Sequence, residues 1–161
     1  MDSVNALFSR GLVSEDQRVM LAGFCKRWNC SGFEALIETN MISERAFADL
    51  ASDILRLPRV PDVRGSTLSP DTLALLPFPF ARSRGCLVLG MSGPADSRIF
   101  RVAIANPWDR ETRMMVEDML HGDVEWFIGE RSHIIEAIDR HFPLSSIVPH
   151  FWEVLAVKNH D

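Results

Sequence analysis

The stretch "VAIANPWDRE", residues 102–111, begins with the pattern of a β-strand and ends with the pattern of a helix. Four small or apolar residues open it, as in a buried strand. Asn106, Pro107 and Asp109 then offer a capping oxygen, a fixed φ and a negative charge, all of which favour a helix start. Two N-cap assignments fit: Asn106 with Pro107 at the first helical position, or Asp109 itself. The stretch predicts a strand joined directly to a helix.

Similar elements surround this unit. Strands are expected at residues 85–91, 98–105 and 123–129, and helices at about 69–77, 108–120 and 130–142. Ser69 is the expected cap of the first of these helices, with Pro70 at its first position. Ile134, Ile135 and Ile138 are the expected buried face of the last one. Together these elements predict a three-stranded sheet with helices on one face.

An internal repeat precedes these elements. Residues 6–15 ("ALFSRGLVSE") and 35–44 ("ALIETNMISE") align without gaps, with identical Ala, Leu, Ser and Glu. Gly11 and Asn40 occupy equivalent positions and suit the left-handed residue that ends a helix. Ser14 and Ser43 follow as helix N-caps, and Gln17 completes a capping box with Ser14. Each copy therefore predicts a helical hairpin, and the second is expected to end at residues 57–58, because Pro58 cannot continue a helix.

The predicted fold class is α+β, with an N-terminal helical hairpin repeat followed by a small three-stranded sheet packed with helices. We expect residues 1–57 to be a helical subdomain and residues 58–69 a connector. An α+β subdomain would cover residues 70–143, and a helical tail or linker residues 144–161.

Composition narrows the function classes. The 161 residues carry a formal net charge of −5, and 47% of them are hydrophobic. An acidic chain without a dense Lys/Arg cluster is not expected to bind nucleic acid. We expect no secretion signal and no membrane span, because no stretch reaches the roughly 20 apolar residues that a span needs. Cys25, Cys30 and Cys86 form no CxxC pair, so reduced, inert thiols in a cytoplasmic protein are expected.

Motifs for chemistry are absent from the sequence. It contains no Walker A loop, GxGxxG, GxSxG or HExxH pattern. The five histidines lack metal-ligand spacing, and the paired carboxylates have no sequence neighbour that would shift their pKa. The sequence therefore predicts no catalytic residue, no metal site and no enzymatic activity. A stand-alone enzyme would need a cleft with a perturbed titratable group.

The order of the motifs resembles one known family. In sequence come "GLVSEDQ", "NMISERA", "LASDILRLPRV", "SPDTLALLPFPFARSRGCLVLGM", "RVAIANPWDRETRMMVEDM" and "DVEWFIGERSHIIEAIDRHF". This order resembles the MshEN-type N-terminal domain of type II secretion and type IV pilus assembly ATPases, over about residues 5–142. Residues 105–109 match that family's "ADPxD", with Asn106 in place of the first aspartate. Ser14, Ser43, Asn106, Pro107 and Asp109 are the structural signature.

The resemblance implies a non-catalytic regulatory or docking domain. In such ATPases it precedes the ATPase domain and engages the cytoplasmic part of an inner-membrane platform protein. The same module also occurs on glycosyltransferases and response regulators. Trp28, Phe78 and Trp152 are the candidate exposed aromatic contacts, although each also fits half-buried packing.

The resemblance also implies an alternative, a cyclic di-GMP sensor. Some members bind that nucleotide through two copies of RLGxxLxxxGxxxxxxLxxxLxxQ, one per hairpin. Leu7, Gly11 and Leu36 match the motif here. Other positions depart from it: Arg-Leu-Gly is replaced by Asp2-Ser3-Val4 in the first copy and by Ser31-Gly32-Phe33 in the second, and the closing glutamine is missing from both. Asp or Ser cannot replace an arginine that stacks on guanine and pairs with phosphate, so the motif is degenerate.

Overall fold

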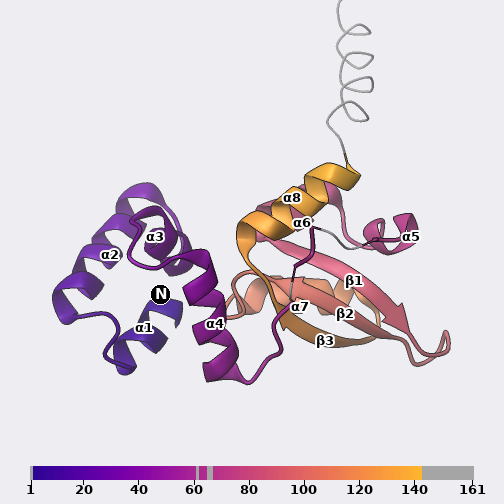
Figure 1. Ribbon diagram of the computed structural model, residues 1–161, viewed down its shortest axis with the longest axis horizontal. Coiled ribbons are helices and arrows are strands. Elements are labelled where there is room, and N and C mark those ends of the chain that lie inside the picture. Colours follow the sequence, from indigo (N-terminus) through magenta and orange to yellow (C-terminus); the bar gives the residue numbers. More distant parts are fainter. Residues whose placement is uncertain (1, 61, 65–66, 143–161) are drawn as a thin grey trace, which may run out of the picture.

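Two helical hairpins are followed by a small sheet with helices in the computed structural model, which describes residues 2–60, 62–64 and 67–142. We call helices α1–α4 the helical part and the elements from α5 onward the sheet part; the two lie side by side in Figure 1. The helices and strands are α1 (Asp2–Ser9), α2 (Glu15–Trp28), α3 (Gly32–Glu38), α4 (Glu44–Leu55), α5 (Pro70–Leu73), α6 (Phe78–Arg84), β1 (Cys86–Ser92), β2 (Ile99–Ile104), α7 (Arg110–Leu120), β3 (Asp123–Ile128) and α8 (Arg131–His141).

The helix boundaries of the repeat follow local rules. Gly11 and Asn40 adopt the left-handed φ values of +70° and 53° that the sequence predicts after α1 and α3. Ser14 caps α2 in a complete capping box with Gln17, and Ser43 caps α4. The end of α4 differs from the prediction. The helix stops at Leu55, because Arg56 takes a left-handed conformation before Pro58 is reached.

The sheet has the strand order β1-β2-β3, with β1 antiparallel and β3 parallel to β2. Residues 58–60 extend its edge, because the amide of Ile128 donates to the carbonyl of Pro58 at 2.8 Å and Val60 donates back at 2.9 Å. The predicted connector thus begins as a short bridge along β3. The subdomain boundaries remain a prediction, and residues 143–161, with the predicted tail, lie outside the described residues.

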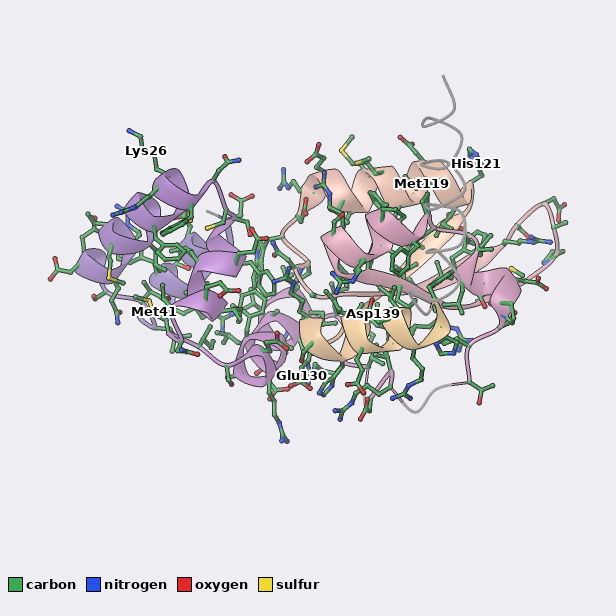
Figure 2. The ribbon with its side chains drawn as sticks, turned by 90° about the horizontal axis from the view of Figure 1, so that it is seen from above. Lys26, Met41, Met119, His121, Glu130 and Asp139 are labelled. Atoms are coloured by element: carbon green, nitrogen blue, oxygen red, sulfur yellow. The ribbon has the colours of Figure 1, made fainter. Side chains whose placement is uncertain are left out.

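Helices cover both faces of the sheet, so the prediction of helices on one face is wrong. Figure 2 shows α7 and α8 on opposite sides. Trp126 of β3 packs under α7, with the Arg113 guanidinium 5.2 Å from its ring. On the other face, Ile134 of α8 lies over Gly129 and Ala103. Val102, Ala103 and Ile104 are consecutive and buried, which requires cover on both faces of β2.

The structure also decides between the two N-cap assignments for α7 and identifies the buried face of α8. Asp109 is the N-cap of α7 and accepts a hydrogen bond from the amide of Thr112, so the assignment to Asn106 is wrong. Asn106 instead accepts from the amide of Trp108 at 3.3 Å, which shapes the turn before the helix. In α8, Ile134, Ala137 and Ile138 are buried, whereas Ile135 is half-buried.

Three kinds of contact join the two parts. Aromatic rings run from Phe33 through Phe47 to Trp108, with centroids 4.8 and 5.6 Å apart. Glu44, at the start of α4, accepts hydrogen bonds from the amide and hydroxyl of Ser132 at the start of α8. Arg59 pairs with Asp49 of α4 and Glu130 of the sheet part. These are the contacts that position the cavities described next.

None of the helices in the described ranges is long and apolar enough to cross a bilayer.

Candidate functional site

A polar cavity lies between the helical part and the sheet part. It consists of two adjoining hollows of about 250 and 310 Å³ that share Ser31, Arg84, Asn106 and Asp109. The loop after β2 and the start of α8 border it, so the cavity lies at the carboxyl ends of the two parallel strands. Ligands of open α/β sheets bind at such ends and at contacts between subdomains. The remaining lining residues are Asp2, Ser3, Gly32, Phe33, Glu34, Ser83, Ala105, Trp108, Glu111 and Arg131.

The two repeat copies converge on this polar cavity. Of the six positions where the family motif has Arg-Leu-Gly, five line it, and only Val4 does not. The helix starts of α1 and α3 bring them together, although they lie far apart in the chain. Ser3 is 1% exposed, and its hydroxyl has no hydrogen-bond partner among the described residues. Ser31 instead caps α3 through the amide of Glu34.

The charges of the polar cavity are mostly acidic. Arg84 lies 3.7 Å from a carboxylate oxygen of Asp109 and 3.2 Å from one of Glu111, so its charge is largely compensated. The guanidinium of Arg131 makes no ion pair or hydrogen bond within the described part of the chain. Four carboxylate residues line the cavity against two arginines, because Asp2 and Glu34 add to the other two acids. Binding of a negatively charged ligand is therefore disfavoured in this cavity.

Two of the signature residues, Asn106 and Asp109, line this cavity and act structurally there. Asp109 accepts from the amide and the hydroxyl of Thr112 at 3.0 and 2.7 Å. Thr112 is fully buried. Pro107 is buried within the turn that brings Trp108 against Phe47 of α4. Asn106 and Asp109 thus fix the β2–α7 loop, whose Trp108 contacts the helical part.

A separate apolar groove of about 310 Å³ lies between the two hairpin turns. It is lined by Leu7, Leu12, Val13, Gln17, Leu36, Met41, Ile42, Ala46 and Leu50. The structure brings the predicted ligand residues Leu7 and Leu36 together here, both almost fully buried. Gly11 does not line the groove and instead ends α1. In Figure 2, Met41 marks this groove on the side of the helical part away from the sheet.

The first helical hairpin carries several exposed apolar side chains, of which Leu12 lines the groove. Leu12 is 56% exposed, and Phe8, Val19 and Met20 of the same hairpin are also exposed.

Trp28, one of the predicted contact aromatics, is 63% exposed. Phe78 packs against Phe142 with ring centroids 5.4 Å apart, and Trp152 lies outside the described residues.

Sequence reasoning missed Arg84, Arg131 and Glu34. The signal that could have found the polar cavity is the equivalence of Asp2 and Ser31 in the two repeat copies, because equivalent positions of paired hairpins can meet. Among the described residues, no group of three His, Cys, Asp or Glu side chains could hold a metal ion.

Comparisons with known proteins agree on one family of domains. The model of the MshEN domain matches residues 55–147, more than half of the chain. The type IV pilus assembly ATPase PilB of Thermus thermophilus is 26% identical over 138 residues, which cover 86% of this chain and 15% of PilB. The chain thus spans only a small part of the length of this curated relative.

Solved structures extend the match into the helical part. The structure of MshE with cdg (cyclic di-GMP) is 26% identical, with a TM-score of 0.65 over 85% of this chain and 96% of that chain. The N-terminal domain of XpsE is 22% identical, with a TM-score of 0.66 over 86% of this chain and 92% of that one. The second comparison bears on the fold alone. By its matching domain model and by these relatives, the chain belongs to the MshEN domain family.

Proposed function

We propose that this chain is a non-catalytic docking domain of a larger secretion- or pilus-type protein in the cytoplasm. Its partner would be the cytoplasmic part of an inner-membrane platform protein or an adjacent domain of its own parent chain. A glycosyltransferase or response regulator is the other possible parent. The chain would contribute a protein-binding surface and no chemistry of its own.

The observation that carries the proposal is the replacement of the motif arginines. Asp2 and Ser31 stand where the family's nucleotide-binding arginines are expected, and both line the polar cavity. An aspartate beside Asp109 and Glu111 repels a phosphate instead of pairing with it. The domain thus keeps the family fold, while neither of the two motif positions in its cavity carries an arginine. Protein contact is the family role that remains.

The apolar groove supports this role. A groove between two helical turns, lined by apolar side chains that include the exposed Leu12, suits the apolar face of a partner helix. Leu12 is 56% exposed, so much of its surface can contact a partner. We expect the partner helix to offer its own apolar residues at a spacing of three and four.

Leu12→Asp tests the docking role, with Met114→Asp as the matched control. Both side chains are exposed, at 56% and 65%, but Met114 lies on α7, far from the groove. Each variant is made in the full-length parent in its native cell, and the amount of membrane-platform protein that co-purifies is measured. We expect Leu12→Asp alone to lose the platform protein. Retention by both variants, with unchanged circular dichroism, would overturn the proposal.

One observation favours a second candidate, a cyclic di-GMP sensor. Arg131 presents a guanidinium without a partner among the described residues to the same cavity that the motif positions line. MshE, with 26% identity, has been solved with cdg. In this candidate Arg131 would replace a motif arginine and pair with one phosphate of the nucleotide.

Calorimetry with cyclic di-GMP at micromolar concentrations separates the two candidates. Heat of binding that is lost in Arg131→Ala, and retained in the exposed control Arg110→Ala, would support the sensor. The docking proposal predicts no heat from wild-type protein whose fold is verified by circular dichroism. It also predicts that Asp2→Arg combined with Ser31→Arg raises the affinity, because two charges of the motif are then restored.

A further inference from the structure

The end of α2 brings two cysteines together. Asn29 adopts a left-handed φ of 50°, and the amide of Cys30 donates to the carbonyl of Cys25 at 3.2 Å. This bond is the signature of a Schellman motif, in which the two side chains that flank the turn make contact. Cys25 and Cys30 therefore occupy the contact positions of the motif.

The same arrangement closes α1 and α3 with apolar pairs. There the amide of Leu12 donates to the carbonyl of Leu7, and that of Met41 to Leu36, each at 3.1 Å. At the end of α2 the apolar pair is replaced by two thiols. The two cysteines lack the CxxC spacing, because the left-handed Asn29 brings together residues that are further apart in the sequence.

The two thiols are close and reachable from solvent. The pKa of the Cys30 thiol is raised, first by burial and then by the neighbouring Cys25 thiol. Both side chains are half-buried. Cys30 also lines an open hollow beside Phe24 and the exposed Trp28, so a small reagent can approach the pair from the side of Cys30.

We propose that Cys25 and Cys30 form a dithiol site that hydroperoxides convert into an intrachain disulfide. The Cys25 thiolate attacks one peroxide oxygen, the O–O bond breaks, and a sulfenic acid and hydroxide (or alkoxide) form. The Cys30 sulfur then attacks the Cys25 sulfur, the S–O bond breaks, and the thiol proton of Cys30 leaves with the hydroxyl as water. The pair loses two electrons, which reduce the peroxide.

Cys86 is the internal control for this reaction. It is fully buried in β1, and burial raises its pKa to about 12. Its thiol is therefore neither accessible nor ionised near neutral pH, and it should stay reduced while the dithiol reacts.

Trypsin makes the test direct, because its cleavage sites Lys26 and Arg27 lie between the two cysteines. The reduced 161-residue chain is exposed to hydrogen peroxide, remaining thiols are alkylated, and the digest is analysed by mass spectrometry without reduction. We expect the two cysteine peptides to remain linked in the digest. The undigested chain should be lighter by two hydrogen atoms than the reduced chain, and Cys86 should be alkylated once the chain is unfolded. Cys25→Ser and Cys30→Ser should each abolish the linked peptide.

Substitutions at Asn29 separate the role of the turn from closeness in sequence. Asn29→Gly keeps the left-handed conformation and should oxidise as wild type does, whereas Asn29→Val disfavours it and should slow linkage several-fold. Three results would overturn the proposal: separate peptides with unmodified thiols, sulfinic acid at either cysteine without linkage, or a disulfide that joins two chains. Equal linkage rates in both Asn29 variants would overturn the assignment to the Schellman turn.

Discussion

Asp109 is the residue on which the start of α7 depends. Its carboxylate accepts from the amide of Thr112 and from the buried Thr112 hydroxyl. Asp109→Ala removes the cap and leaves a buried hydroxyl with one partner fewer, which should cost about 1–3 kcal/mol of unfolding free energy. Asn106→Ala loses only the bond from the Trp108 amide and should cost less than about 1 kcal/mol. Urea unfolding checks both, and an equal cost for the two variants would contradict the N-cap assignment.

Cys86 gives stability a specific dependence on alkaline pH. Burial raises the pKa of its thiol from 9.0 to about 12, so the folded state keeps a proton that the unfolded state loses above pH 9.0. Stability is therefore unaffected by this group below pH 9.0 and falls as pH rises from there toward 12. The chain has no tyrosine, which leaves few other groups that titrate in this range. The free energy of unfolding, measured in urea at several alkaline pH values, should fall less steeply with pH in Cys86→Ala than in the wild type. The same slope for both proteins would refute it.

At the scale of single elements, two glycines should respond to alanine in opposite directions. Gly23 is exposed within α2, and a Cβ there would meet nothing within 4 Å. Gly23→Ala should therefore raise stability by about 0.5–1 kcal/mol. Gly122 joins α7 to β3, where a Cβ would lie 2.7 Å from the Phe100 ring and 2.8 Å from the Arg98 carbonyl oxygen. Gly122→Ala should destabilise by about 1–3 kcal/mol. Thermal unfolding of both variants measures the sign of each stability change. A stabilising Gly122→Ala would show that the α7–β3 turn shifts to accept a Cβ at little cost.

The local ends of elements were the predictable part of the fold. Ser14 and Gly11 act on amides and carbonyls within a few residues, so their types alone indicate the cap and the turn. The cover on both sheet faces was missed, because it depends on the parallel crossover from β2 through α7 to β3. The polar cavity was missed for a similar reason. Asp2, Ser31 and Asn106 meet only after both hairpins dock on the sheet part, and periodicity within one element carries no such information.

For the molecule as a whole, the joint between the helical part and the sheet part forms the polar cavity. The polar cavity exists only while the helix starts of α1 and α3 face the loop after β2. Aromatic rings pack against each other across the joint, and Glu44 adds a polar contact by placing a carboxylate at the N-terminus of α8, where negative charge is stabilised. The apolar groove belongs to the helical part alone. Loosening the joint should therefore affect the cavity and spare the groove.

Trp108→Ala tests whether the two parts unfold as one unit. The Trp108 ring stands edge-on to Phe47 of α4, so its removal takes away an aromatic contact across the joint. We expect a loss of about 2–4 kcal/mol. Amide exchange at Leu21 of α2 and Val102 of β2, both fully buried, should report the same opening free energy in the wild type and different values in the variant. Trp28→Ala, at a side chain that is 63% exposed, should leave both values nearly unchanged. Matching values at Leu21 and Val102 in Trp108→Ala would show that Glu44 and Arg59 suffice to couple the two parts.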